Sequence, residues 1–163
     1  MRKQGSYKRQ TRRGDPMHNR VDMGRFINYL MLEGEKSVAE KNFYKALDRI
    51  KEVTKDDPVK VFEKALSNAT PLLEVVSKRI GGANYQIPRE VRPERQFFLA
   101  THWIIAAARS KKGKPIAERL AEEFIAAAKN EGSAIKKKQD MHRMAEANRA
   151  FASLMRSYST RSY

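Results

Sequence analysis

The amino-acid sequence predicts a mainly α-helical protein, a single domain of six helices with one protruding β-hairpin between the third and fourth helices. Most of the chain repeats apolar residues every three or four positions, as amphipathic helices do. Residues 75–88 are the exception, because two short β-capable runs there flank Gly81 and Gly82. A length of 163 residues fits one domain that is large enough to bury a core.

The hairpin is predicted from residues 75–80 and 83–87, two extended runs around the Gly-Gly pair. Glycine reaches the positive φ angles that a tight turn needs. Pro88 has no amide hydrogen, so it should end the second run or leave it as an edge strand. An isolated ribbon of this kind is only marginally stable in water. Its cations therefore indicate contact with an anionic partner; they are Lys78 and Arg79 beside the turn, and Arg89, Arg92 and Arg95 at the base.

The first three helices are predicted from their start signals. Asp22 is expected to cap a first helix that Gly34 closes. Ser37 and Glu40 fit a capping box for the second helix, and the Asp57-Pro58 pair fits the start of the third, which Pro71 brings near its end. The expected apolar stripes are Met23, Phe26, Ile27, Leu30 and Met31; Ala39, Phe43, Ala46, Leu47, Ile50 and Val53; and Val59, Phe62, Leu66, Ala69 and Leu73.

After the hairpin, Pro93 and Pro115 should open the fourth and fifth helices, which the loop 110–114 separates. Residues 130–132 should end the fifth helix. A sixth helix is expected from about Ser133, within a helical domain of residues 21–156. The expected inward residues are Phe97, Phe98, Trp103, Ile104 and Ile105; Ile116, Leu120, Phe124 and Ala127; and Ile135, Met144, Phe151 and Leu154. We expect Phe62, Leu66, Phe124 and Phe151 to belong to the core.

Charge is concentrated at both ends of the chain. The net charge is +15, of which residues 1–20 contribute +6 and residues 133–163 contribute +5. Nucleic acid is the commonest partner for such a surface, and an anionic membrane the next. Residues 1–20 have few large aliphatic side chains, so they are predicted to form a flexible basic tail that orders on a partner. The alternative is a solvated, disordered end. Residues 157–163 are expected to fray.

No pattern of an enzyme or a cofactor site occurs in the sequence. There is no cysteine, hence no disulfide or thiolate metal site. The three histidines, His18, His102 and His142, are far apart, and His142 with Glu146 is expected to be an ordinary surface pair. Gly81-Gly82 lacks the context of a nucleotide-binding loop. We therefore expect no catalytic residue, metal, cofactor or small-molecule substrate. Without an apolar run of about 20 residues or a signal-peptide core, the cytoplasm is the expected location.

A binding surface of three parts remains: the basic tail, the ribbon with its basic root, and the basic face of the last helix. Folded RNA junctions are recognised through phosphates and exposed bases, which suits a rigid body with flexible arms. Tyr85 could stack on a base, or could equally be a cross-strand packing residue. The candidate RNA-binding residues are Arg2, Lys3, Lys8, Arg9, Arg12, Arg13, Arg20, Lys36, Lys78, Arg79, Tyr85, Arg92, Arg95, Lys111, Lys112, Lys114, Lys136, Lys137, Lys138, His142, Arg143 and Arg149.

Several blocks of the sequence match a known family. They are residues 36–40 (KSVAE), 78–88 (KRIGGANYQIP), 90–95 (EVRPER), 106–109 (AAAR), 117–121 (AERLA) and 142–151 (HRMAEANRAF). On these blocks the chain resembles the bacterial family of small-subunit ribosomal protein seven. The resemblance implies six helices with a β-ribbon. It also implies primary binding to the 3′ major domain of small-subunit ribosomal RNA, nucleation of the subunit head, and a place near exit-site tRNA, the mRNA exit channel and neighbouring ribosomal proteins.

Two other classes of function are compatible with the composition. A basic RNA chaperone or DNA-compacting protein would use the same charge without a fixed site. Such a protein would show no preference for a ribosomal RNA fragment over arbitrary RNA at equal salt. A peripheral membrane protein would need a helix whose basic and apolar faces are both exposed. The apolar stripes are all expected in the core, so this alternative ranks last.

Overall fold

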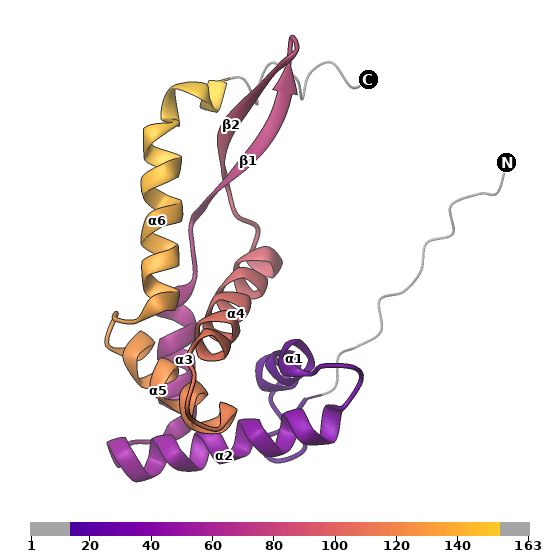
Figure 1. Cartoon of the computed structure of the whole chain (residues 1–163), viewed down its shortest axis with the longest axis vertical. Helices are drawn as coiled ribbons and strands as arrows, with labels where there is room; N and C mark the ends of the chain where they lie inside the picture. Colours follow the sequence, from indigo (N-terminus) through magenta and orange to yellow (C-terminus); the bar gives the residue numbers. More distant parts are fainter. Residues whose placement is uncertain (1–13, 154–163) are drawn as a thin grey trace, which may run out of the picture. The chain divides into compact units, whose positions relative to one another are not determined.

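The computed structural model describes residues 14–153, and the chain divides into two compact units, Met1–Glu40 and Lys41–Tyr163. Figure 1 shows the order of the elements. They are α1 (Val21–Leu30), α2 (Lys36–Thr54), α3 (Pro58–Ala69), β1 (Leu73–Ile80), β2 (Ala83–Glu90), α4 (Pro93–Ser110), α5 (Ile116–Ala128), α6 (Ser133–Ala147) and the 3₁₀ helix η1 (Arg149–Ala152). Across residues 14–153, the predicted class of six α-helices with one hairpin between the third and fourth is confirmed. None of the described helices is long and apolar enough to cross a membrane.

The loop before α1 is organised by Asp15. Its buried carboxylate accepts hydrogen bonds from the backbone amides of Met17 (3.3 Å), His18 (3.0 Å) and Arg20 (2.9 Å). The residue before α1 is Arg20, and Asp22 is already the second residue of the helix. Asp22 instead forms an ion pair with Arg20 at 2.7 Å. The prediction that Asp22 caps α1 is therefore wrong.

The turn between α1 and α2 also differs from the prediction. Helix α1 ends at Leu30, and Met31, which was assigned to the helix, has extended backbone with ψ 141°. Gly34 adopts φ +82° within the turn rather than at the end of the helix. Helix α2 starts at Lys36, and the Ala39 amide donates to the Glu35 carbonyl at 3.2 Å. Ser37 therefore lies inside the first turn, and the predicted capping box is wrong.

Three phenylalanines form the centre of the core in Lys41–Tyr163. Phe43 on α2, Phe62 on α3 and Phe124 on α5 are fully buried. Their ring centroids are 5.6 Å apart for Phe43 and Phe62, 5.4 Å for Phe62 and Phe124, and 6.5 Å for Phe43 and Phe124. All three pairs meet edge to face, the arrangement that the ring quadrupole favours. With Leu66 also buried, three of the four expected core residues are confirmed, whereas Phe151 is only half-buried.

Helix α3 starts where the sequence predicts. The Asp57 carboxylate accepts from the Val59 amide at 3.0 Å, and Pro58 is the first helical residue. The helix ends at Ala69 because Thr70, which precedes Pro71, is extended. Leu73 was assigned to the stripe of this helix but belongs to β1.

Two apolar residues predicted in helical stripes face solvent instead. Val53 near the end of α2 is 56% exposed, and Met144 on α6 is also exposed. The last helix is shorter than predicted, because α6 ends at Ala147 and η1 follows. Asn148 breaks the helix with φ −99° and ψ 13°, and its side-chain amide donates to the Met144 carbonyl at 2.8 Å. Leu154 lies outside the described residues.

The ribbon is longer than predicted. Strands β1 and β2 pair antiparallel from Leu73↔Glu90 to Ile80↔Ala83, and Pro88 pairs with Val75 inside the ladder. Proline is tolerated there because both strands of a two-stranded ribbon are edges, with amides that point away from the partner. Gly81 and Gly82 have φ +56° and +93°, so both turn residues use the left-handed region that glycine permits. The predicted starts of α4 and α6 are confirmed.

The role of Phe124 in the core can be tested by substitution. Replacing it with alanine should lower the free energy of unfolding by about 3–5 kcal/mol, because a large cavity would open among the three rings. Chemical denaturation followed by circular dichroism would measure this loss. The control is Val53→Ala, which removes an exposed apolar side chain and should change stability little. A Phe124→Ala variant as stable as wild type would contradict the assignment of Phe124 to the core.

Candidate nucleic-acid interface

The ribbon and α6 lie side by side in the unit Lys41–Tyr163 (Figure 1). Helix α6 packs against β1 and β2, and η1 packs against β2 near the tip. The Tyr85 ring meets the Phe151 ring with centroids 5.4 Å apart and planes at 61°. This contact ties the ribbon to the segment that follows α6. Two of the three predicted parts of the surface are therefore neighbours.

The tip of the ribbon carries its cations close to the turn. Lys78 stands opposite Tyr85, and Arg79 opposite Asn84. Arg79 is exposed, and no partner for its side chain occurs within residues 14–153. Tyr85 packs on Phe151, a residue of η1. The ring is only half-buried, so stacking on a base stays a prediction.

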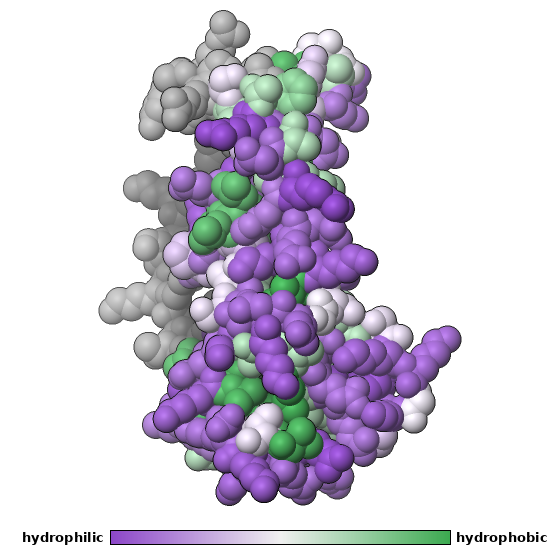
Figure 2. Space-filling view, turned by 90° about the vertical axis from the view of Figure 1, so that its left-hand side faces the viewer, coloured by the Kyte–Doolittle hydropathy of each residue, from purple (hydrophilic) through white to green (hydrophobic). Residues whose placement is uncertain are grey.

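Helix α6 and η1 present four exposed cations. Lys136 and Lys137 have no partner in the described part of the chain. Arg143 lies 2.8 Å from Asp140, and Arg149 lies 3.4 Å from Glu146. Exposed pairs of this kind contribute at most about 1 kcal/mol, so their cations remain open to a stronger anion. Figure 2, which views the molecule from the α6 side, shows mainly hydrophilic side chains, with an apolar area in its lower part.

Lys138, in contrast to these four cations, is bonded inside the fold. Its ammonium donates to the Asn68 carbonyl at 2.7 Å, and the Asn68 amide donates to the carbonyls of Ala127 and Ala128 at 2.9 and 3.1 Å. Burial lowers the pKa of Lys138. These bonds satisfy carbonyls at the ends of α3 and α5 and tie α6 to both. Lys138 was predicted as an RNA contact, and its geometry is that of a structural residue.

His142 also has an internal partner. Its Nε2 accepts a hydrogen bond from the Leu72 amide at 3.1 Å, which requires a ring that is unprotonated at that nitrogen. Burial, and next the charge of Lys138, lower the pKa of His142 and so favour this form. Glu146 forms its ion pair with Arg149 instead of the expected surface pair with His142. His142 therefore joins α6 to the start of the ribbon.

At the root of the ribbon, Glu74 holds two arginines. Glu74 is 5% exposed, and its Oε1 accepts from Arg89 Nε at 2.8 Å and Nη2 at 2.6 Å, while Oε2 accepts from Arg95 Nε at 3.3 Å. Burial acts to raise the pKa of Glu74, but the bonds to Arg89 and Arg95 outweigh it and hold that pKa below its ordinary value. Arg92 and Glu90 line the same hollow. The arginines were predicted from the sequence as the basic root of the ribbon, whereas Glu74 was not.

The loop before α5 uses two of its three lysines internally. Lys111 lies 3.0 Å from Glu123, a fully buried carboxylate, and Lys114 forms an ion pair with Glu122. Lys112 is exposed, and the described residues include no partner for it. Of these three predicted contacts, only Lys112 is uncommitted.

Eight further candidates belong to the unit Met1–Glu40. Arg20 is bonded to Asp22, and Lys36 lies 3.9 Å from Glu40. The other six lie outside the described residues: Arg2, Lys3, Lys8, Arg9, Arg12 and Arg13.

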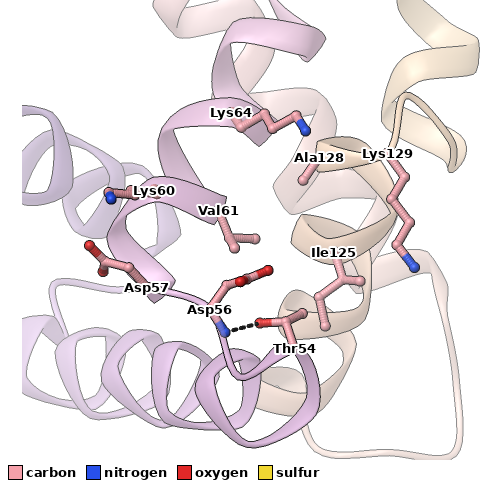
Figure 3. A pocket seen from close by; sticks show the side chains of 9 residues that line it. All are labelled: Thr54, Asp56, Asp57, Lys60, Val61, Lys64, Ile125, Ala128 and Lys129. Carbon is pink, nitrogen blue, oxygen red and sulfur yellow. Dashed lines mark hydrogen bonds between the residues drawn. The ribbon is translucent and has the colours of Figure 1, made fainter.

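A separate hollow lies between the end of α2, α3 and α5 (Figure 3). Its lining is Thr54, Asp56, Asp57, Lys60, Val61, Lys64, Ile125, Ala128 and Lys129. The Asp56 amide donates to the Thr54 hydroxyl at 3.3 Å, and Asp57 already caps α3. Three of these residues are lysines and two are aspartates, and Val61, Ile125 and Ala128 add apolar surface. Among the described residues, no three His, Cys, Asp or Glu side chains are grouped to hold a metal ion.

These features define a basic, mainly helical protein with a ribbon and an adjoining cationic helix. The family model described as Ribosomal protein S7p/S5e matches residues 1–149. The chain is 56% identical over 138 residues to small ribosomal subunit protein uS7 of Dictyoglomus turgidum, which covers 85% of this chain and 88% of that protein. It is 53% identical over 152 residues to the uS7 protein of Thermotoga maritima, covering 93% and 97%.

The chain belongs to the ribosomal protein S7p/S5e family. It is a structural constituent of the small ribosomal subunit in the cytoplasm, a family role that is structural rather than catalytic. The resemblance seen in the sequence blocks is confirmed.

The bond between His142 and Leu72 predicts a pH dependence of stability. A lowered folded-state pKa means that the unfolded chain binds the proton first, so stability is complete above about pH 6.5 and falls as the pH drops through the folded pKa. Glutamine can accept from the Leu72 amide without titrating, so His142→Gln should lose less thermal stability than wild type as the pH falls below about 6.5. His142→Ala leaves that amide without its acceptor and should be less stable than wild type above about pH 6.5, where the wild-type bond is intact. Equal pH profiles for wild type and His142→Gln would refute the assignment.

Proposed function

We propose that this protein is a primary RNA-binding protein of the small subunit. It binds the 3′ major domain of small-subunit ribosomal RNA at a multi-helix junction and nucleates assembly of the subunit head. Family membership supports a ribosomal RNA partner. Neighbouring ribosomal proteins are the further partners in this proposal.

The observation that carries the proposal is the attachment of the ribbon to α6 and η1. Through Tyr85 and Phe151, two cationic elements are held beside each other in one compact unit. A protein with cations on two neighbouring elements can contact two RNA segments at once, as a junction presents them. Arg79, Lys136 and Lys137 are exposed and lack partners within residues 14–153, so they are ready to contact phosphate.

The remaining candidates divide by their geometry. Arg92, Lys112, Arg143 and Arg149 are exposed and serve as further phosphate contacts in the proposal. Lys111, Lys114, Lys138 and His142 are engaged inside the fold and would support RNA binding by positioning helices. The segment 1–20 adds a cationic arm of seven lysines and arginines.

The proposal is tested by comparing two RNA fragments of equal length, one from the 3′ major domain and one from the 5′ domain. At equal salt, the 3′ fragment should bind at least about 10³-fold more tightly, because charge alone supplies only non-specific affinity. Filter binding over a range of salt concentrations would measure both constants. Equal affinity for the two fragments would favour the RNA chaperone instead.

The ribbon tip is proposed to lie near exit-site tRNA and the mRNA exit channel. Lys78→Ala with Arg79→Ala should then leave binding of the 3′ major domain within a few-fold of wild type, because the α6 cations remain. Subunits assembled with this variant should retain less exit-site tRNA. The matched control, Lys60→Ala with Lys64→Ala, removes the same charge from α3 and should retain tRNA normally. Normal retention by the ribbon variant would contradict a role for the tip.

A further inference from the structure

A cluster of one acid and three arginines stands where the ribbon leads into α4. Glu74 of β1 bonds Arg89 of β2 and Arg95 of α4, and Arg92 is the residue just before α4. Together with Glu90 they line a single hollow. We propose that Glu74 is a positioning residue, which sets Arg89 and Arg95 so that they and Arg92 bind one backbone phosphate of RNA. This inference rests on the proposed function and assigns Arg89 and Glu74 to it.

The bonds to Glu74 use three of the six nitrogens of the two guanidinium groups. Arg89 donates its Nε and Nη2 to a single carboxylate oxygen, and Arg95 donates only its Nε. The side chains of Arg89 and Arg95 remain 47% and 48% exposed. Arg89 Nη1 and both Nη groups of Arg95 have no acceptor within residues 14–153. Glu74 thus fixes each guanidinium through hydrogen bonds, and each guanidinium keeps further N–H donors for a ligand.

A second contact fixes the plane of Arg95. Its guanidinium carbon lies 4.9 Å from the centroid of the Phe98 ring, one turn along α4. An arginine restrained by both a carboxylate and an aromatic face loses little conformational freedom when it binds an anion. Planar N–H groups match the oxygens of a phosphate, which accept two parallel hydrogen bonds. The cluster therefore has the geometry for a phosphate rather than for a general negative charge.

The charge balance of the cluster gives a test in which two explanations predict opposite signs. With Glu90 counted, the three arginines and two carboxylates of this hollow leave one net positive charge. If the cluster acts only through that charge, removing either carboxylate should strengthen RNA binding. If Glu74 positions the arginines, removing its charge should weaken binding, whereas removing the exposed Glu90 should not. Glu74→Gln and Glu90→Gln are isosteric and change the net charge equally.

The experiment measures binding of the full chain to the 3′ major domain fragment over a range of salt concentrations. Glu74→Gln should weaken binding at least about 10-fold, the effect of losing a hydrogen bond to a charged group. It should also lower the slope of log affinity against log salt by roughly one. Glu90→Gln should bind as tightly as wild type or more tightly. Arg95→Lys, which keeps the charge but loses the planar donors, should behave like Glu74→Gln.

A looser ribbon would also weaken binding, and a second measurement separates this cause. Amide hydrogen exchange of Val76 and Ile87, which pair in the ribbon, should match wild type in Glu74→Gln. The losses from Glu74→Gln and Arg79→Ala should multiply in the double variant, because the two sites are independent. Wild-type or tighter binding by Glu74→Gln overturns the inference, and so does weaker binding with lost exchange protection. If wild-type protein does not prefer the 3′ fragment, the proposed function fails instead.

Discussion

The placement of the cationic surface depends on one buried carboxylate, that of Glu123. Its Oε1 accepts from the Ala134 amide in the first turn of α6 at 3.0 Å, and its Oε2 lies 3.0 Å from the Lys111 ammonium. Oε2 accepts no hydrogen bond within residues 14–153, so the Lys111 charge is its compensation. Because a buried charge is tolerated only beside such partners, Glu123 favours the meeting of α5, α6 and the loop before α5 at this point. Gly132 has φ +94°, and a Cβ there would lie 2.9 Å from Glu123 Oε1. The joint between α5 and α6 is therefore fixed by polar chemistry as well as by apolar packing, and the direction of α6 sets where Lys136 and Lys137 face.

The cations of this chain serve two purposes that the net charge does not distinguish. Lys111 and Lys138 compensate buried acceptors, and their contribution is to hold α6 against α3 and α5. Exposed cations such as Arg79 and Lys137 contribute little to folding, since nothing in the described structure pairs with them. Arg89 and Arg95 serve both purposes, because one side of each guanidinium satisfies Glu74 and the other stays exposed. An anionic partner therefore meets a surface whose cations are partly fixed in advance, which reduces the entropy lost on binding.

The sequence predicted best where a local signal has no competitor. Gly81-Gly82, Asp57-Pro58 and Pro93 each specify a turn or a helix start through their own backbone preferences, and the structure uses them so. The prediction was wrong where two residues nearby could play the same part. Asp15 rather than Asp22 organises the start of α1, because three backbone amides of the preceding loop donate hydrogen bonds to the Asp15 carboxylate. Glu74 and Glu123 were missed because their partners are distant in the sequence. Arg89 is 15 residues from Glu74, and Ala134 is 11 residues from Glu123. No periodicity of the sequence marks such contacts.

The ribbon shows how these constraints combine. Two strands alone are marginal in water, yet this pair extends from Leu73 to Glu90 because it is held at both ends. At the root, Glu74 links both strands to α4, and at the tip Tyr85 packs on Phe151. The break of α6 at Asn148 is what brings Phe151 onto a 3₁₀ turn beside β2, so a feature that looks like a helix defect positions the partner of Tyr85. The tip of the ribbon and the segment that follows α6 are therefore packed together. A change that moves η1 should move the cations of the turn with it.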